Sequence, residues 1–212
     1  TSRHRGAATP PAAPATAASA SKPLVERSIA GFILPAYAGF HASTAKLKDA
    51  VAGLCAKPSA ESLEAARAGF RDTVHAWSTA EIIRFGPVTE QNRLDRILFW
   101  PDRKGTGLKQ VQAALAQSDA TATNAATLAG KSVAMQGLGA LEFILYGTGA
   151  DDLATAPQSY RCAYGAAVAA NLDGMAGEIE LGWQAPDGIA AAWENPGADN
   201  ALYRDDSEAL GE

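Results

Sequence analysis

Apolar side chains recur at intervals of three and four residues along most of the chain after residue 23. This spacing places them on one face of an α-helix, and no stretch alternates apolar and polar residues for long enough to indicate a strand. The pattern predicts helices over residues 24–56, 59–82, 93–98, 107–117, 124–146 and 157–183. A chain with this pattern is expected to be all-α and to fold as an up-and-down helical bundle.

Changes in composition divide the chain into three expected parts. Residues 1–22 are rich in Ala, Pro and Ser without periodicity, which is typical of a flexible linker or a processed N-terminus. Residues 23–150 are expected to form a helical bundle, whose first helix Pro35 should kink or split. Residues 151–212 are expected to hold a long helix and a loop that begin a second, incomplete helical unit. A new helix is predicted at Asp206, near the last residue, so we expect the front part of a longer protein.

Composition and charge exclude several classes of protein. Hydrophobic residues make up 47% of the chain and charged residues 19%, as in a globular protein rich in helix. The net charge of −5 and the lack of a basic stripe argue against nucleic acid as a partner. No run of apolar residues is long enough for a transmembrane segment. A spacer like residues 1–22 often follows a cleaved signal or a lipid anchor in exported bacterial proteins, although an expression tag would look the same.

Two cysteines, Cys55 and Cys162, lie 107 positions apart on predicted helices. They form no Cys-x-x-Cys or Cys/His cluster, so these thiols do not indicate a zinc site. Two interpretations remain open. Both could be independent buried thiols, or they could form one disulfide in an oxidising compartment.

The first stretch with candidate chemistry runs from Trp77 to Asp102. It combines aromatic and charged side chains with an otherwise apolar helical pattern, and the helix should break at Phe85-Gly86-Pro87. A core would not need these charges and a solvated face would not need these aromatics, so a partly buried polar site is indicated. Its candidate residues are Trp77, Glu81, Arg84, Arg93, Trp100 and Asp102.

The second stretch is the apolar run around Glu142. Gly137 and Gly139 are predicted to lie inside a helix, where glycine costs about 1 kcal/mol relative to alanine. They suggest the close approach of another backbone or of a ligand. Glu142 should be paired with an arginine or bind a ligand, because an unpaired buried charge is costly. Tyr146 lies one turn further on the same face.

Two interpretations of these stretches remain open. In the functional one, the charged residues Glu81, Arg84, Arg93, Asp102 and Glu142 surround one pocket with Trp77, Trp100 and Tyr146 as its walls. A pocket with both acids and arginines would suit an anionic or zwitterionic ligand, or a metal chelate. In the structural one, the same acids pair with arginines between helical units, and Asp102 caps the helix after its loop. His41, a lone histidine on the first helix, is read as structural.

Three sequence blocks, FGPV, FWPD and QGLGALE, together resemble the imelysin-like family. Its members are exported bacterial proteins, often lipoproteins, which are associated with iron uptake and were historically classed as metallopeptidases. More narrowly, the chain resembles the branch of predicted periplasmic lipoproteins. The resemblance implies two related helical bundles with a site in the cleft between them. The family's Gly-x-His-x-x-Glu motif, thought to bind metal, corresponds here to residues 137–142, with Gly139 in place of the histidine.

This departure shapes the functional expectation. A His/Glu pair at i, i+3 could hold an ion, whereas one carboxylate needs further ligands. We therefore expect a non-enzymatic periplasmic binding or accessory protein of iron or haem uptake, which binds a divalent metal, iron or another ligand. The expected partners are those of iron or haem uptake, and a lipid anchor could have been removed from this chain. The alternatives are a metal-dependent peptidase and a structural interaction module.

Overall fold

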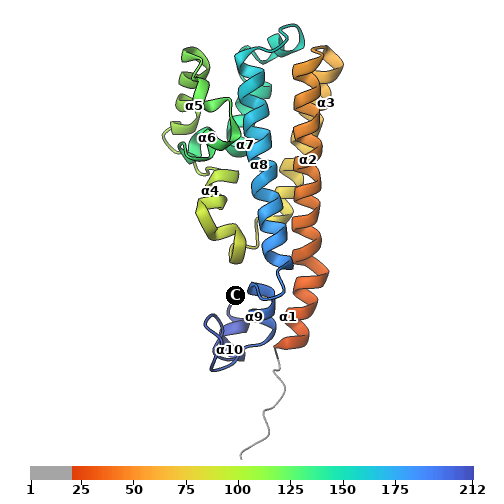
Figure 1. Cartoon of the computed structure of the whole chain (residues 1–212), viewed down its shortest axis with the longest axis vertical. Helices are drawn as coiled ribbons and strands as arrows, with labels where there is room; N and C mark the ends of the chain where they lie inside the picture. Colours follow the sequence, from red (N-terminus) through yellow and green to blue (C-terminus); the bar gives the residue numbers. More distant parts are fainter. Residues whose placement is uncertain (1–20) are drawn as a thin grey trace, which may run out of the picture.

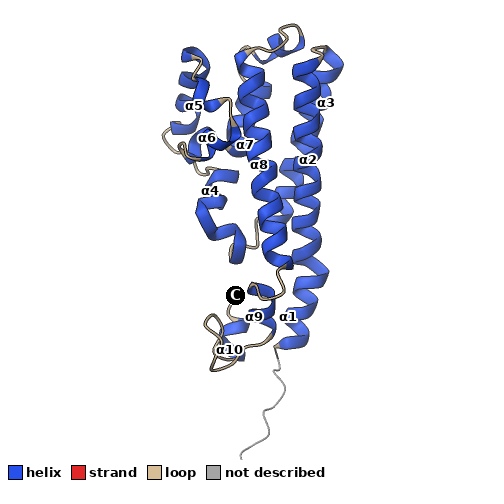
Figure 2. Cartoon of the chain, viewed as in Figure 1, coloured by secondary structure: helices blue, strands red, loops and turns tan. Residues whose placement is uncertain are grey.

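A computed structural model describes residues 21–212 of the protein, and every described element is helical (Figures 1 and 2). The expected linker over residues 1–22 therefore lies outside the described residues except for its last two, and Lys22 already belongs to a helix. The described chain contains no strand. The expected all-α helical bundle is confirmed.

The bundle is built from long helices that run side by side (Figure 1). Helix α2 (Leu34–Ala56) packs against both α3 (Ala60–Ala80) and α8 (Tyr160–Gln184), and α7 (Gly137–Tyr146) completes the group by packing on α3 and α8. A short connection makes α2 and α3 antiparallel neighbours, and Ser59 and Ser62 form a capping box at the start of α3. The largest core side chains include Tyr37, Phe40, Leu47, Leu141, Tyr164 and Trp183.

The first helix continues through Pro35 instead of breaking there. Helix α1 (Lys22–Ser28) passes into a π-helical turn, η1 (Ile29–Ile33), and then into α2. The N–H of Leu34 donates to the carbonyl of Ile29, five residues back. A π-turn adds a residue to the helical ring, so the expected disturbance at Pro35 takes the form of a widened turn in a continuous helix.

The segment 124–146, expected to be one helix, consists of three pieces. These are α6 (Ala125–Ala129), a 3₁₀ turn η4 (Val133–Met135) and α7. The break lies at Gly137, whose φ is +68° and whose position would bring a Cβ within 2.2 Å of the carbonyl oxygens of Arg96 and Ile97. Gly137 therefore begins a helix instead of lying inside one, because the backbone before it turns to pass α4 (Arg93–Ile97).

Helix α8 lies inside the first bundle. It packs along α2, and Asp173 and Glu180 of α8 contact His41 of α2. The domain boundary expected at residue 150 thus falls within a packed group of helices. The segment after α8 forms α9 (Ile189–Glu194) and α10 (Asp206–Leu210) at one end of the bundle, where Trp193 donates to the carbonyl of Ala209. The helix expected at Asp206 is present.

A disulfide joins Cys55, near the end of α2, to Cys162, near the start of α8. Of the two interpretations of the cysteines, the disulfide is therefore the correct one. On the chain-entropy model, closing a loop of this length stabilises the fold by about 4–5 kcal/mol. None of the helices in the described part of the chain is long and apolar enough to cross a membrane.

Candidate functional site

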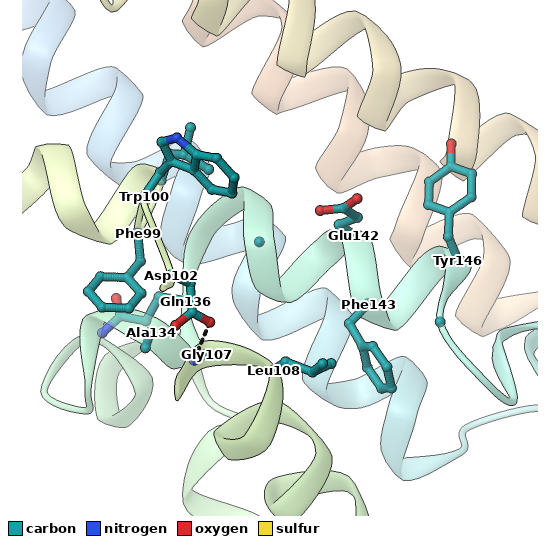
Figure 3. A pocket seen from close by; sticks show the side chains of 13 residues that line it. Phe99, Trp100, Asp102, Gly107, Leu108, Ala134, Gln136, Glu142, Phe143 and Tyr146 are labelled. Atoms are coloured by element: carbon teal, nitrogen blue, oxygen red, sulfur yellow. Dashed lines mark hydrogen bonds between the residues drawn. The ribbon is translucent and has the colours of Figure 1, made fainter. Parts of the chain in front are cut away.

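A cleft of about 420 Å³ lies between α7 and the segment that joins α4 to α5 (Thr106–Gln117) (Figure 3). Apolar and aromatic side chains make up most of its lining. The residues that line it are Leu98, Phe99, Trp100, Asp102, Gly107, Leu108, Ala134, Gln136, Gly139, Glu142, Phe143, Tyr146 and Gly147. Both the FWPD block and the QGLGALE block contribute to one site.

The close contact at Gly137 sets which face of α7 meets the cleft. With the helix start fixed against the carbonyls of Arg96 and Ile97, residues 139, 142 and 146 share one face, since they lie three and four positions apart. That face of α7 carries Gly139, Glu142 and Tyr146, and all three residues line the cleft. The expected close approach of a backbone is thus present at Gly137, while nothing lies within 4 Å of a Cβ at Gly139.

Glu142 is exposed, so the expected burial is wrong, and of its two expected roles the pairing with an arginine is not found among the described residues. Within the part of the chain that the structure describes, no hydrogen bond or ion pair joins its carboxylate to another residue. The apolar neighbours that suggested burial, Leu141, Ile144 and Leu145, face the core on the other side of the helix. Glu142 therefore presents an uncompensated negative charge to the cleft.

The negative charge of Asp102, unlike that of Glu142, has hydrogen-bond partners. Its two carboxylate oxygens accept hydrogen bonds from the backbone N–H groups of Thr106 (2.6 Å) and Gly107 (2.8 Å) at the start of α5. The positive end of the helix dipole adds to these bonds, so this charge is largely compensated. The interpretation of Asp102 as a helix cap is confirmed, although the residue also lines the cleft.

Aromatic side chains form the walls. The Trp100 side chain is 76% exposed and that of Tyr146 is 42% exposed. The Tyr146 hydroxyl donates to the carbonyl of Arg67 (3.0 Å), and the Arg67 guanidinium lies over the Tyr146 ring at 5.2 Å from its centroid. Tyr146 is thus held in place by α3, whereas most of the Trp100 surface remains open.

A buried polar group supports the floor of the cleft. Gln136 accepts hydrogen bonds from Arg96 (3.1 Å) and from Asn171 (2.9 Å), and it donates to the carbonyl of Lys131 (2.9 Å). Burial lowers the pKa of Arg96 from its ordinary value. These hydrogen bonds tie α4 to α8, and Arg96 itself is not among the residues that line the cleft.

Four of the predicted site residues lie elsewhere. Trp77 is buried in the core, with its ring centroid 5.1 Å from that of Phe40. Glu81 is half-buried at the C-terminal end of α3, and Arg84 is exposed just beyond it. None of these three lines the cleft.

Arg93 is also outside the cleft, and its contacts fit the structural interpretation. The buried guanidinium donates to the carbonyl of Pro87 (2.7 Å) and to the carboxylate of Glu178 on α8 (2.6 Å). The structure thus separates Trp77, Glu81, Arg84 and Arg93 from Trp100, Asp102, Glu142 and Tyr146. Since the arginines do not reach the cleft, the expectation of an anionic ligand or a chelate loses its basis.

Sequence reasoning missed several residues of the cleft, among them Phe99, Leu108 and Phe143. Phe99 could have been found, because it lies inside the FWPD block. Leu108 and Phe143 could not have been found, because each follows the apolar spacing of its own helix and is therefore expected to be a core residue.

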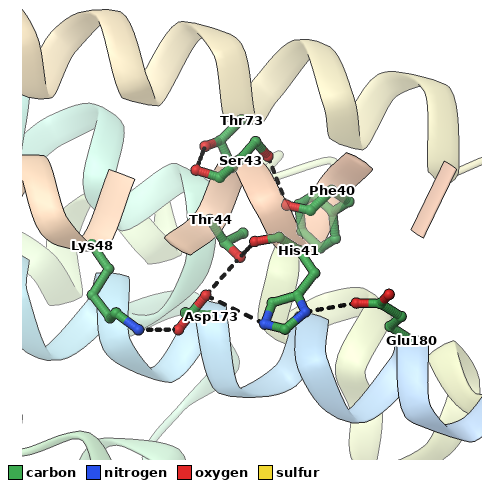
Figure 4. A network of polar contacts seen from close by, with 8 residues as sticks. All are labelled: Phe40, His41, Ser43, Thr44, Lys48, Thr73, Asp173 and Glu180. Carbon is green, nitrogen blue, oxygen red and sulfur yellow. Dashed lines mark hydrogen bonds and ion pairs between the residues drawn. The ribbon is translucent and has the colours of Figure 1, made fainter. Parts of the chain in front are cut away.

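A second polar group joins α2 to α8 around His41 (Figure 4). The His41 ring contacts Glu180 through Nδ1 (2.7 Å) and lies 3.7 Å from Asp173 through Nε2. Thr44 and Lys48 also contact Asp173. These interactions satisfy one another across a helix interface, which supports the structural interpretation of His41.

No group of three or more His, Cys, Asp or Glu side chains among residues 21–212 is arranged to hold a metal ion. At the cleft, Glu142 is accompanied by Gly139 where a histidine would be needed, and Asp102 is engaged at a helix end. The described residues therefore do not form a metal centre there.

Comparisons with known proteins agree with the three sequence blocks. The family model described as imelysin matches residues 33–212. A crystal structure of an imelysin-like protein from Psychrobacter arcticum 273-4 matches with a TM-score of 0.69 and 27% sequence identity, over 77% of this chain and 50% of that one. The chain thus spans about half the length of that solved structure. Among curated proteins none matches the chain.

Proposed function

The chain belongs to the imelysin family, and on that premise we propose that it is a non-enzymatic ligand-binding or accessory protein of the bacterial periplasm, linked to iron or haem uptake. The observation that carries the proposal is the exposed face of α7, where Gly139 and Glu142 open onto an aromatic cleft. The size of this cleft, about 420 Å³, lies in the range of small-molecule sites. The link to iron or haem uptake rests on family resemblance.

The chemistry of the donor groups favours binding over peptide hydrolysis. A metallopeptidase needs an ion with an open coordination position and a general base beside it. Glu142 could serve one of these roles but not both, and Gly139 has no side chain to offer as a ligand. A peptidase would therefore need ligands beyond those that the described residues place at the cleft.

The disulfide supports the periplasmic location. Disulfides form and persist in oxidising compartments such as the bacterial periplasm and are rare in the cytosol. Cys55 and Cys162 are buried or half-buried at a helix interface, where they serve no evident catalytic purpose. Their bond suits a protein that folds after export.

The test is the metal content and the peptidase activity of protein purified without chelator. Elemental analysis and native mass spectrometry would compare the wild type with Glu142→Gln and with Glu81→Gln, a matched change of a carboxylate outside the cleft. We expect no stoichiometric metal that depends on Glu142 and no chelator-sensitive cleavage of a peptide when zinc or iron is added. Stoichiometric metal that is lost only in Glu142→Gln, with such cleavage, would overturn the non-enzymatic proposal.

A gain-of-function variant sharpens this test. Gly139→His would restore a His/Glu pair at i, i+3 on the face of α7, and a Cβ at this position has no heavy atom within 4 Å. We expect the variant to bind zinc more tightly than the wild type in a competition assay with a chromophoric chelator. Equal zinc binding by both proteins would show that residue 139 does not govern metal affinity here.

A further inference from the structure

We propose that the cleft on α7 selects a small organic cation that carries an apolar group, with Glu142 as the counter-charge and Trp100 as the exposed aromatic wall. This inference rests on the proposed function, because it names the class of ligand that the binding protein would take. It follows from the charges and the apolar surfaces that line the cleft.

The charge of the lining is negative. Among its thirteen residues there is no Lys, Arg or His, and the two carboxylates are Asp102 and Glu142. Asp102 is compensated by two backbone N–H groups at the start of α5, whereas Glu142 has no counter-charge among the described residues. An anionic ligand would thus meet one open carboxylate and no cation, while a positively charged ligand would gain the one interaction that Glu142 lacks.

Four arginines contact residues of the lining, and each has other partners. Arg96 donates to Gln136 and Asn171, and Arg71 donates to the Tyr146 hydroxyl and pairs with Glu64. Arg67 pairs with Asp151 (2.9 Å) and bonds the carbonyl of Leu145 (2.9 Å). Arg161 lies over the Phe143 ring, 5.6 Å from its centroid, and donates to the carbonyls of Ile144 (3.0 Å) and Thr148. The guanidinium groups of Arg67 and Arg161 bond carbonyls at the C-terminal end of α7. Among the described residues, none of the four arginines forms an ion pair with Glu142.

The aromatic surface suits an organic cation. Guanidinium groups already lie over the rings of Tyr146 and Phe143, which leaves Trp100 as the most open ring in the lining. Tryptophan is the side chain whose face attracts a cation most strongly. Trp100, Glu142 and Tyr146 line the same cleft (Figure 3), so a cation bound there would share the cleft with the carboxylate and with aromatic walls.

The apolar lining decides between an inorganic and an organic cation. A protein binds a metal ion tightly only through several ligand atoms, whereas this cleft offers a single free carboxylate. An organic cation can bury its apolar part against Leu98, Leu108 and Phe143 while its charge stays near Glu142. The chemistry of the site therefore points to an ammonium or guanidinium compound with an aromatic or aliphatic body.

A set of three probes with the same body tests the charge preference. The probes are 3-phenylpropylammonium, the neutral 3-phenyl-1-propanol and the anionic 3-phenylpropanoate, titrated into the full chain at low salt and followed by the NMR shift of the Trp100 indole N–H and by calorimetry. We expect the ammonium to bind about three- to fivefold more tightly than the alcohol, as one exposed charge pair allows, and the carboxylate to bind most weakly.

Variants assign the preference to residues. In Glu142→Gln the ammonium should lose about three- to fivefold in affinity and the alcohol should be unaffected, because only the charge interaction is removed. Glu81→Gln is the matched control, and there the ammonium should keep its wild-type affinity. In Trp100→Leu both the ammonium and the alcohol should bind more weakly. Circular dichroism of each variant would verify the fold.

The outcomes separate this inference from the proposed function. If the alcohol binds as tightly as the ammonium, or if Glu142→Gln leaves the ammonium affinity unchanged, the cleft binds ligands without selecting a cation and the inference is overturned alone. If none of the three probes binds, both the inference and the assignment of the cleft as a ligand site are overturned. Tighter binding of the anionic probe would contradict the charge argument directly.

Discussion

Gly137→Ala should destabilise the protein strongly, although alanine is the better helix former. The φ of Gly137 is +68°, a conformation that costs an L-residue about 1–2 kcal/mol. A Cβ there would also lie 2.2 Å from the carbonyl oxygens of Arg96 and Ile97, against about 3.5 Å for ordinary contact. Because these are backbone atoms, α4 itself must move. We expect the free energy of unfolding to fall by about 3 kcal/mol or more.

Gly139→Ala provides the control two residues away. Gly139 lies inside α7, and a Cβ there meets no heavy atom within 4 Å. Its free energy of unfolding should stay the same or rise by up to about 1 kcal/mol, as helix propensity predicts. Urea denaturation followed by circular dichroism would measure both variants, with equal slopes as the check on two-state unfolding. Equal effects at the two positions would refute the assignment of Gly137 as the residue that fits α7 against α4.

Three further predictions concern a covalent link and two carboxylates. Replacing both Cys55 and Cys162 by Ser should lower the free energy of unfolding by about 4–5 kcal/mol in urea denaturation, and a reductant should then affect the wild type but not the double variant. Glu142→Gln should change the free energy of unfolding by less than about 0.5 kcal/mol in the same assay, because the carboxylate is exposed and has no partner among the described residues. A decrease in the free energy of unfolding several times larger would indicate a buried ion pair. The hydrogen bond from the Lys131 ammonium holds the pKa of Asp119 at about 2. Since this pKa is depressed on folding, the carboxylate stabilises the protein above about pH 4 and loses that contribution as the pH falls towards about 2. Asp119→Asn should remove that part of the pH dependence, and an NMR titration of the carboxyl groups would contradict the reasoning if Asp119 titrated near pH 4.

The helices could be predicted from apolar spacing, and the errors have local causes. The helix α3 was predicted correctly from Ser59 and the periodicity after it. The N-cap residue and the apolar positions that follow both indicate a helix starting at this point. The prediction of a single helix over residues 124–146 was wrong, because the apolar residues there keep a helical period across a turn. The turn depends on Gly137 meeting the carbonyls of α4, a contact between distant segments that no local pattern contains.

The grouping of the candidate site residues agrees with the structure in part, for a similar reason. Asp102 and Glu142 were correctly placed with Trp100 and Tyr146, because their sequence blocks combine polar and aromatic residues where neither core nor surface requires both. Glu81 shares the same stretch but lies apart, since periodicity shows which residues share a face and not where that face points.

The direction of the chain after Glu81 was the missing information. Gly86 has a φ of +69° and fits against Trp183 and Ile189, where a Cβ would lie 3.1 Å and 3.2 Å from their side chains. This contact directs the chain towards the end of the bundle near α9. The chain reaches the cleft only later, at Leu98. The aromatic contacts of Phe85 with Trp183 and Trp193 stabilise this course.

The disulfide also determines how the polypeptide would transmit a mechanical load. Because Cys55 and Cys162 are covalently joined, tension applied along the chain passes from α2 to α8 through the two sulfur atoms. Residues 56–161 form a closed loop outside that path, and the cleft with Glu142 lies within it. A pull on the chain would therefore leave the cleft unstretched, and a single cut in the loop would leave both fragments attached to one another.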